Sequence, residues 1–403
     1  MSERRHTDLK YVVLIVDGAA GWPVEELGGL TSLQAARTPN LDALAKDGTL
    51  GLAHTIPEGM EPSSAIACMS VLGFDPAEHY RGRGPIEALA LGIQLEPNQA
   101  ALRCNLVTVV DGLMRSYSAG HISSPESHQL IAALNREIGS ERVAFYPGVG
   151  FRHIVTVRDG VDIVNTVCTP PHDIHDQPVA EHLPRGPGGF FLQDLMDHSR
   201  EILSDHPVNE ARRERGELPA TQIWLFWPGL QPDAMPSFAG TYGIEGALTS
   251  GVDLLEGLAR QVSLEVLRIP GVTDGLDNDF AGQIAGSLQA LEDHDLVVVH
   301  VEAPDEAGHS GDVAGKVEAL EKVDELMVTQ VLRRPDVRLL VLPDHPTPLA
   351  TRTHTAEPVP FLIWGPGVKA NGARGYSEAE ASATGLEVSP GHSLLGRFLR
   401  AEF

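Results

Sequence analysis

Tyr11-Val-Val-Leu-Ile-Val-Asp17 is a continuous apolar run that ends on a carboxylate, and two similar runs follow much later in the chain. These are Leu296-Val-Val-Val-His-Val-Glu-Ala-Pro-Asp305 and Val337-Arg-Leu-Leu-Val-Leu-Pro-Asp344-His345. We interpret all three runs as strands of one parallel sheet. Open sheets of this kind gather their ligands at the carboxyl ends of the strands, so we expect the three ends to form one site.

The segments around these runs alternate between strand and helix patterns, for example a helix from Pro39 that ends before Gly48 and a long amphipathic helix over 313–332. Between about 96 and 219 the pattern changes to strand-like pieces divided by Asp111-Gly112 and by loops rich in Gly and Pro. We therefore predict an α/β fold, with a doubly wound, mostly parallel sheet formed by residues 1–95 and 220–403. Residues 96–219 are predicted to form a smaller inserted α/β cap domain.

The composition narrows the class of protein. The 403 residues carry a formal net charge of -25, which argues against nucleic acid or an anionic membrane surface as the main partner. An anionic small substrate would need a local basic pocket. The three cysteines form no CxxC pair, and the chain shows neither a secretory signal nor an apolar run of membrane-spanning length. We expect a cytoplasmic protein, and the sequence leaves its oligomeric state open.

The strand ends carry metal-type ligands. Asp305 and His309 are four residues apart, so on a helical turn they face the same way and can bind one ion together. Asp344 and His345 follow the third run, and His354 lies on the loop after it. Taken alone, Asp305 and His309 could be an N-terminal helix carboxylate and a surface histidine, and Asp344 with His345 would be a weak signal. Together with Asp17, however, these oxygen and imidazole groups are enough for two divalent cations.

Ser64 is the best candidate for a nucleophile near such a site. Pro62 precedes an apolar stretch that predicts a helix beginning at Ser64 and ending before Gly73. A hydroxyl at that position lies at the positive end of the helix dipole, where an alkoxide or a phosphate ester is favoured. The alternative is that Ser63 or Ser64 serves only as the N-cap of the helix.

Several motifs together resemble a known family. They are Leu14-Ile-Val-Asp17-Gly18, Thr38-Pro-Asn-Leu-Asp-Ala-Leu-Ala, Ser70-Val-Leu-Gly-Phe-Asp-Pro76, Gly82-Arg83-Gly-Pro-Ile-Glu-Ala, Asp305-Glu-Ala-Gly-His309, Lys316 with Glu321-Lys-Val-Asp324, and Pro343-Asp-His-Pro-Thr-Pro. The chain resembles, over nearly its whole length, cofactor-independent phosphoglycerate mutases of the archaeal type, in the alkaline phosphatase superfamily. Thr169-Pro-Pro-His-Asp-Ile and His206-Pro-Val-Asn look most like a bacterial branch that carries the label homoserine kinase.

The resemblance implies how the ligands divide. One cation would be held by Asp305, His309 and His354, and a second cation by Asp17, Ser64, Asp344 and His345. Ser64 would take the phosphoryl group from the substrate as a phosphoserine and return it to a different hydroxyl of the same molecule. The expected ions are two Mn²⁺, with Zn²⁺, Co²⁺ or Mg²⁺ as alternatives.

A phosphorylated three-carbon acid also needs cationic contacts. Arginine suits this role because its planar fork binds carboxylates and phosphates bidentately. Arg83 and Arg152 are the first candidates because they lie in segments that resemble the family. Further candidates for substrate binding are Arg115, His121, His172, Asp173 and Lys316.

One departure from the family pattern concerns the reaction itself. The family loop usually reads Gly-Ser-Asp at the nucleophile, whereas this chain has Ser63-Ser64-Ala65. An altered substrate or a weakened mutase activity is therefore an open alternative. So are a phosphatase or phosphodiesterase that uses the same site, a homoserine kinase-like phosphotransferase, and a homologue that only binds metal or ligand. The first expectation is a mutase acting on 2- and 3-phosphoglycerate or a similar phosphorylated or phosphonate acid.

Overall fold

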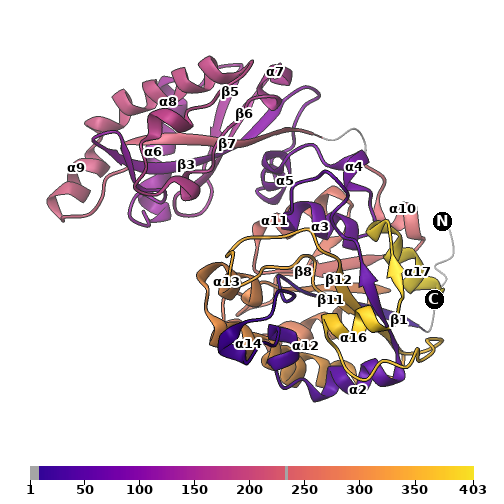
Figure 1. Cartoon of the computed structure of the whole chain (residues 1–403). Coiled ribbons are helices and arrows are strands. Elements are labelled where there is room, and N and C mark those ends of the chain that lie inside the picture. Colours follow the sequence, from indigo (N-terminus) through magenta and orange to yellow (C-terminus); the bar gives the residue numbers. More distant parts are fainter. Residues whose placement is uncertain (1–8, 232–234) are drawn as a thin grey trace. The chain divides into compact units, whose positions relative to one another are not determined.

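The structure is a computed structural model that describes residues 9–231 and 235–403. Among these residues, one compact unit is formed by 9–80 and 235–403 and a second by 81–231 (Figure 1). The second unit thus begins and ends outside the expected limits of 96 and 219. Helix α5 (Arg83–Ala90) and strand β7 (Gln222–Leu230) both pack on strand β3 (Ala100–Val110), which draws them into this unit.

The first unit is built on an eight-stranded sheet with the order β13-β2-β12-β11-β1-β10-β8-β9. Its strands are β1 (Lys10–Val16), β2 (Thr49–Ala53), β8 (Gly246–Thr249), β9 (Glu265–Val266), β10 (Leu296–Val301), β11 (Val337–Leu342), β12 (Val359–Trp364) and β13 (Glu387–Val388). Among the described strands of this sheet, the pairings of β12 with β11 and with β2 are antiparallel, and the other pairings are parallel. The predicted α/β fold with a mostly parallel sheet is therefore confirmed.

Strand β1 lies between β10 and β11 and runs parallel to both. Its residues from Val12 to Val16 are at most 3% exposed, as expected for a strand that is covered on both faces. The three apolar runs of the sequence are thus adjacent strands with a common direction. Their carboxyl ends consequently meet at one edge of the sheet.

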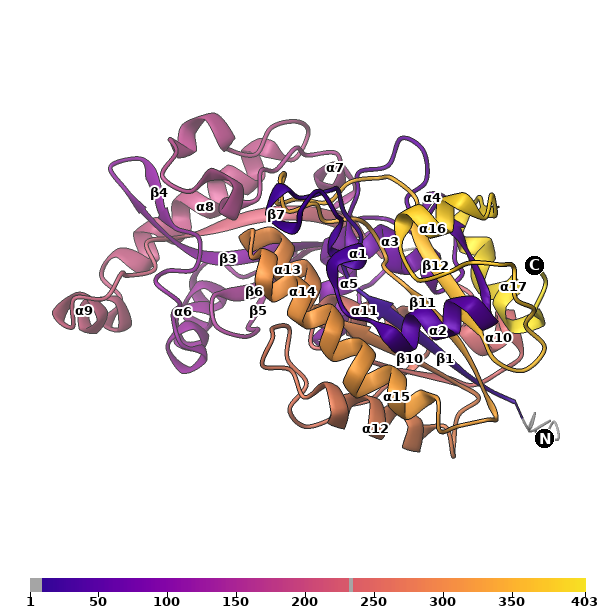
Figure 2. The ribbon, with the colours of Figure 1, turned by 60° about the horizontal axis from the view of Figure 1, so that its bottom comes forward.

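Helices accompany this sheet in the first unit. They are α1 (Ser32–Ala35), α2 (Pro39–Asp47), α3 (Ser64–Val71), α4 (Pro76–His79), α10 (Phe238–Tyr242), α11 (Asp253–Gln261), α12 (Phe280–Ala290), α13 (Ala303–Ser310), α14 (Val313–Lys322), α15 (Thr329–Val331), α16 (Glu378–Ala383) and α17 (Leu394–Arg400). The long helix predicted over 313–332 is α14 and α15 joined by a π-helical segment, Val323–Val328 (Figure 2). Short 3-10 turns occur at Glu25–Leu27 and Gly391–Ser393.

The second unit is an antiparallel sheet with its own helices. Besides β3 and β7 it contains β4 (Leu113–Ser116), β5 (Val143–Tyr146) and β6 (Arg152–Val157). Its helices after α5 are α6 (Ser124–Glu137), α7 (Val161–Val164), α8 (Gly189–Ser204) and α9 (Pro207–Glu214), with 3-10 turns at Pro171–Ile174 and Val179–His182. Asp111 and Gly112 have φ of 51° and 74°, the left-handed conformation that a two-residue hairpin turn needs between β3 and β4.

Candidate metal centre

The site lies where β1, β10 and β11 end. Asp17 follows β1 directly, Asp305 is in the first turn of α13 after β10, and Asp344 follows β11. Their exposed fractions are 0%, 2% and 0%, so three carboxylates are buried together at the sheet edge. The structure brings these three acids together, as the sequence analysis expected from the parallel strands.

Asp305, His309 and His354 form a first group of ligand atoms, all within 4.8 Å of one another. His309 Nε2 lies 3.1 Å from Asp305 Oδ2 and 2.9 Å from His354 Nε2. His309 Nδ1 lies 2.9 Å from the carbonyl oxygen of Arg352, which can only accept, so Nδ1 carries the hydrogen. A metal-binding histidine typically donates its other ring N–H in this way. The hydrogen bond to Asp305 raises the pKa of His309 to about 9.

Asp17, Asp344 and His345 form a second group within the same 4.8 Å limit. His345 Nε2 lies 3.7 Å from Asp17 Oδ1 and 3.2 Å from Asp344 Oδ2. Burial lowers the pKa of His345 to about 4, so its ring is neutral at pH 7 and has a lone pair for a cation. Asp344 Oδ1 accepts hydrogen bonds from the backbone N–H groups of Gly18 and His345, which fixes its orientation.

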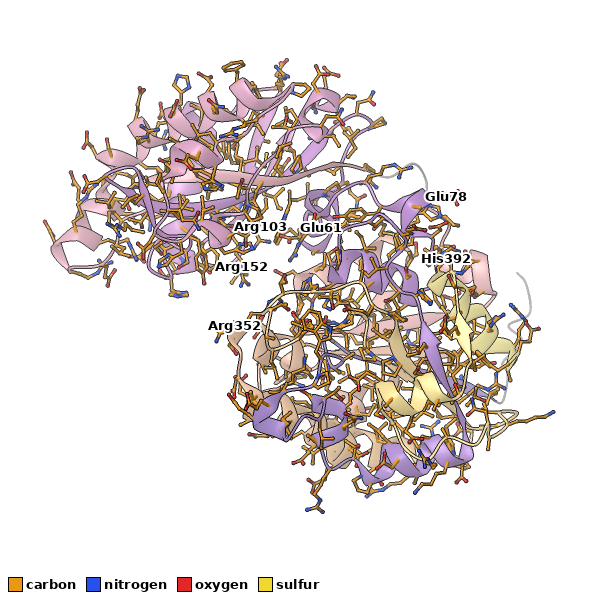
Figure 3. The ribbon with its side chains drawn as sticks, in the orientation of Figure 1. Glu61, Glu78, Arg103, Arg152, Arg352 and His392 are labelled. Atoms are coloured by element: carbon orange, nitrogen blue, oxygen red, sulfur yellow. The ribbon has the colours of Figure 1, made fainter. Side chains whose placement is uncertain are left out.

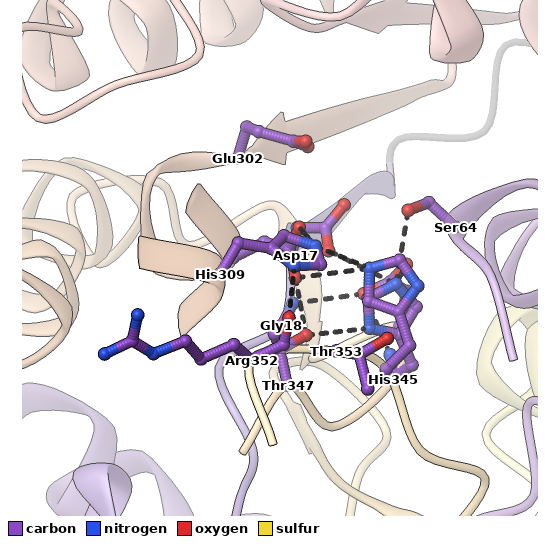
Figure 4. A network of polar contacts seen from close by, with 12 residues as sticks. Asp17, Gly18, Ser64, Glu302, His309, His345, Thr347, Arg352 and Thr353 are labelled. Carbon is purple, nitrogen blue, oxygen red and sulfur yellow. Dashed lines mark hydrogen bonds and ion pairs between the residues drawn. The ribbon is translucent and has the colours of Figure 1, made fainter. Parts of the chain in front are cut away.

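Ser64 adds a hydroxyl to the second group. It is the first residue of α3, and its Oγ lies 3.2 Å from His345 Nε2 (Figure 4). Ser63 occupies the N-cap position, yet its side chain makes no capping hydrogen bond. The helix N-terminus therefore presents the Ser64 hydroxyl to the buried ligands, in the positive end of the helix dipole.

The charge balance of the site fits a divalent cation. Burial, and then the carboxylates of Asp344 and Asp305, raise the pKa of Asp17 well above its usual value. Asp17 Oδ1 is a buried oxygen without a hydrogen-bond partner among the described residues. Burying charged carboxylates is costly unless a positive charge compensates them. Carboxylate oxygens and imidazole nitrogens are ligands for divalent transition metals, so the residues present suit such ions.

Lys316 lies in this unit, in α14, and is only 1% exposed. Its Nζ donates to the carbonyl oxygen of Thr347 at 2.7 Å and approaches that of Ala20 at 3.4 Å. The Thr347 hydroxyl in turn donates to Asp305. Burial lowers the pKa of Lys316 to about 8. These contacts make Lys316 a support for two loops of the site, while its contact with substrate stays a prediction.

Three residues around Asp17 were not predicted from the sequence. His300 Nε2 lies 2.7 Å from Asp17 Oδ2, Glu302 approaches the same imidazole at 3.5 Å, and Cys68 Sγ lies 3.4 Å from Asp344 Oδ2. His300 and Glu302 are polar residues at alternate positions near the end of an apolar strand. This alternation was the available signal, because it gives them one side of the strand.

The predicted substrate-binding residues other than Lys316 lie in the second unit. The Arg83 guanidinium lies 3.9 Å from the ring centre of Trp227 and its Nε is 2.7 Å from Glu87 Oε1. Arg152 is exposed at the start of β6, 5.1 Å from the ring centre of Phe151. Figure 3 shows Arg152 on the same side of this unit as Arg103.

The other predicted residues of this unit are exposed. The His172 ring lies 5.7 Å from that of Trp227, and Asp173 lies 3.7 Å from His172. His121, with φ of 54°, has its ring 6.3 Å from that of Phe151. Arg115 pairs with Asp176 at 2.6 Å, so its guanidinium already has a carboxylate partner. Arg83 and His172 thus share one aromatic neighbour, whereas Arg115 lies in a separate ion pair.

Comparison with known proteins gives consistent matches. The family described as 2,3-bisphosphoglycerate-independent phosphoglycerate mutase matches residues 45–209. A protein of Methanothrix thermoacetophila with that name is 46% identical over 392 residues, covering 96% of this chain and 98% of the relative. One of Methanosarcina acetivorans with the same name is 45% identical over 361 residues, covering 88% and 90%.

Two solved structures are similar over nearly the whole chain. The PH0037 protein from Pyrococcus horikoshii has a TM-score of 0.82 and 28% identity, with 97% of both chains covered. The cofactor-independent phosphoglycerate mutase from Thermoplasma acidophilum has a TM-score of 0.66 and 26% identity, with 98% of this chain and 100% of that chain covered. In the described part of the chain, no helix combines the length and apolar character needed to cross a membrane. By these matches, the chain belongs to the family of 2,3-bisphosphoglycerate-independent phosphoglycerate mutases.

Proposed function

We propose that this chain is an enzyme that interconverts 2-phosphoglycerate and 3-phosphoglycerate by transferring the phosphoryl group through Ser64. The names of relatives that are 46% and 45% identical support a mutase over a phosphatase or a kinase. The observation that carries the proposal is the Ser64 hydroxyl, which lies 3.2 Å from His345 at the start of a helix and beside two groups of metal-type ligands.

In this proposal each residue has a defined task. Asp305, His309 and His354 hold one divalent cation, and Asp17, Asp344, His345 and Ser64 hold the other. When bound, such cations offset the negative charge that develops on the phosphoryl oxygens and lower the pKa of an adjacent hydroxyl. Ser64 Oγ forms a bond to phosphorus as the bond from phosphorus to the substrate oxygen breaks. The other hydroxyl of the same substrate then takes the phosphoryl group from phosphoserine 64.

The second unit would supply contacts for the substrate. Arg83 and Arg152 are the first candidates for its carboxylate or phosphate, with Arg115, His121, His172 and Asp173 as further candidates. Because Glu87 and Trp227 already fix the Arg83 side chain, little rotamer entropy remains to be lost on binding. Arg152 is exposed and has more freedom.

We propose Mn²⁺ as the working ion, because the site mixes carboxylates with imidazoles and its proposed substrate is a phosphate ester. Zn²⁺, Co²⁺ and Mg²⁺ remain the alternatives for the assay. We also infer that the enzyme works in the cytoplasm, since its three cysteines are free and such thiols suit a reducing compartment.

The test of the function measures two products together. The chain is incubated with 3-phosphoglycerate and Mn²⁺, and 2-phosphoglycerate is measured against free phosphate. The mutase predicts 2-phosphoglycerate in large excess. Free phosphate as the main product would mean that water attacks phosphoserine 64, which would agree with Ala65 standing where the family pattern has a carboxylate.

A further inference from the structure

Thr347 lies between the two groups of metal-type ligands. Its hydroxyl donates to Asp305 Oδ1, in the first group, at 2.5 Å, and it lies 3.3 Å from His345 Nδ1, in the second group (Figure 4). Thr347 and His345 are 0% exposed and Asp305 is 2% exposed, so both contacts are buried. The proposed phosphoryl transfer gives Thr347 no task, although its side chain contacts a ligand of each group.

The position of Thr347 is fixed by its surroundings. Its backbone N–H donates to the carbonyl oxygen of Ala20 at 3.0 Å, and its own carbonyl oxygen accepts from Lys316 Nζ at 2.7 Å. Helix α13 approaches the side chain closely, because a Cβ added to Gly308 would lie 2.8 Å from Thr347 Cγ2. Since the methyl group is held against Gly308, the stiff β-branched side chain keeps its hydroxyl between the two ligands.

The hydroxyl has one hydrogen, so only one of its two contacts can use it. Asp305 receives this hydrogen, because that contact is the shorter one and a charged acceptor forms the stronger hydrogen bond. Burial raises the pKa of Asp305, but hydrogen bonds from His309 and His354 outweigh it and hold the pKa well below its usual value. Thr347 Oγ1 then accepts from His345, which places the ring hydrogen of His345 on Nδ1.

The hydrogen on Nδ1 decides what the other ring nitrogen of His345 can do. A neutral imidazole has a single N–H, so Nε2 is left with a lone pair. Nε2 lies 3.2 Å from Ser64 Oγ, 3.2 Å from Asp344 Oδ2 and 3.7 Å from Asp17 Oδ1. With the hydrogen on Nε2 instead, His345 would have no lone pair there for a cation. The second group therefore depends on a hydroxyl that is held by a ligand of the first group.

We propose that Thr347 is a positioning residue, which sets the tautomer and the ring orientation of His345 and so prepares it to bind the cation of the second group beside Ser64. Asp305, a ligand of one group, thus orients a ligand of the other group through a single hydroxyl. The inference rests on the proposed function only in that His345 is a metal ligand there.

Two substitutions separate the hydroxyl of Thr347 from its packing. Thr347→Val keeps the shape of the side chain and removes the hydroxyl, whereas Thr347→Ser keeps the hydroxyl and removes the methyl group. Thr249→Val is the matched control, because Thr249 is 1% exposed in the same unit and its Oγ1 has no hydrogen-bond partner among the described residues. Circular dichroism shows whether each variant is folded.

The first readout is the tautomer of His345 in metal-free protein. Nuclear magnetic resonance of the chain with isotope-labelled histidine shows which ring nitrogen carries the hydrogen, and His345→Asn identifies the signal by its loss. We expect the hydrogen on Nδ1 in the wild type, in Thr347→Ser and in Thr249→Val. In Thr347→Val an Nδ1–H would be buried without that acceptor, which is costly, so the hydrogen should move to Nε2.

The second readout is the affinity for Mn²⁺, measured by isothermal titration of metal-free protein. Thr347→Val should weaken the binding of one of the two ions by at least about tenfold, as expected when the outer partner of a metal-binding histidine is removed. Thr347→Ser and Thr249→Val should bind both ions like the wild type. Rescue by serine would assign the effect to the hydroxyl.

Three results would overturn the inference. They are a hydrogen on Nε2 of His345 in the wild type, a folded Thr347→Val variant with unchanged tautomer and affinity, and an equal loss of affinity in Thr347→Ser. The wild-type tautomer decides even if Thr347→Val fails to fold. Neither readout uses turnover, so a wild type that forms no 2-phosphoglycerate would contradict the proposed function and leave the role of Thr347 standing.

Discussion

At the scale of single residues, the mutase proposal depends on the Ser64 hydroxyl. Ser64→Ala should lower the formation of 2-phosphoglycerate by at least about a thousandfold, because no phosphoserine can form. Ser63→Ala is the matched control, since Ser63 Oγ is buried next to it but has no hydrogen-bond partner among the described residues. The control should keep nearly full activity. Equal loss in both variants would show that a change in α3, not the hydroxyl, causes the effect.

A second residue-scale prediction concerns acid stability of the second unit. Burial lowers the pKa of His153, which is 1% exposed on β6, to about 3. In the unfolded chain the pKa is near 6.5. Between these values the unfolded state binds a proton that the folded state does not bind, so stability is full above pH 6.5 and falls as the pH drops toward 3.

His153→Asn should remove this pH dependence while keeping an acceptor for the backbone N–H of Gly148, which donates to His153 Nδ1 at 3.0 Å. Urea unfolding at pH 7 and pH 5 measures the free energy of unfolding of each protein. Between pH 7 and pH 5 the free energy of unfolding of the wild type should fall by about 2 kcal/mol more than that of the variant. The exposed His198→Asn serves as control and should leave the difference unchanged. Equal losses in the wild type and His153→Asn would contradict the prediction.

Residues at the ends of apolar runs could be predicted from the sequence, whereas residues inside such runs could not. Asp17, Asp305 and Asp344 stand out because each interrupts an apolar pattern where a strand ends. His300 lies within the buried strand β10, and its alternation with Glu302 is the available signal, which by itself does not distinguish it from an ordinary core histidine. Asp17, the residue that His300 contacts, is 283 residues away in the sequence, and no local pattern indicates that contact.

At the scale of elements, the turn after β1 must approach α13 closely. Gly18 has a φ of 61°, and a Cβ added there would lie 2.4 Å from Asp305 Oδ1 and 2.8 Å from Asp305 Cα. Gly18→Ala should therefore displace Asp305 and weaken binding of Mn²⁺ by at least about tenfold, as expected when a ligand is moved. Isothermal titration of metal-free protein with Mn²⁺ measures the affinity.

Gly28→Ala is the control for this prediction. Gly28 has a similar φ of 69°, but a Cβ added there meets nothing within 4 Å. This variant should lose about 1 kcal/mol of stability from the left-handed backbone and keep its Mn²⁺ affinity. If Gly18→Ala binds Mn²⁺ like the wild type, the close approach to Asp305 has no role in the site.

A buried ion pair joins α5 to β3 in the second unit. Glu87 is 5% exposed and contacts both Arg83, at 2.7 Å, and Arg103. Glu87→Gln should destabilise this unit by about 3 kcal/mol, because it leaves buried guanidinium charge without its carboxylate. Glu96→Gln, which breaks the exposed pair with Arg158, should cost less than about 1 kcal/mol. Urea unfolding followed by tryptophan fluorescence tests both, and equal costs would contradict the burial argument.

Helix α5 and strand β7 explain why the domain limits differ from those expected. The apolar run that forms β7 could belong to either sheet, because a buried strand gives no local signal of its partner. Gly84 of α5 makes a close approach to β3, since a Cβ there would lie 2.2 Å from the carbonyl oxygen of Ala101. Such contacts assign α5 and β7 to the second unit. They depend on tertiary packing, which the spacing of apolar residues in the sequence does not reveal.

At the scale of the whole molecule, every proposed metal ligand belongs to the first unit. A ligand that binds only the folded state stabilises the part that binds it, by about 2.7 kcal/mol when its concentration is one hundred times its Kd. Proteins with more than one domain often unfold in more than one step. Chelation should therefore abolish the mutase activity and lower the unfolding temperature of the first unit while sparing the second.

The tryptophans allow the two units to be followed separately. Trp22 and Trp364 belong to the first unit, and Trp224 and Trp227 to the second. In a Trp22→Phe/Trp364→Phe variant, fluorescence reports the second unit alone, while circular dichroism reports both. EDTA should lower the midpoint temperature of the first unit's unfolding, which is seen by circular dichroism. It should leave unchanged the midpoint temperature that is seen by fluorescence. Mn²⁺, Co²⁺ or Zn²⁺ should restore the first transition and the activity better than Ca²⁺, because imidazole ligands disfavour large, hard ions. A fluorescence transition that shifts equally with EDTA would mean that the metal centre stabilises both units as one.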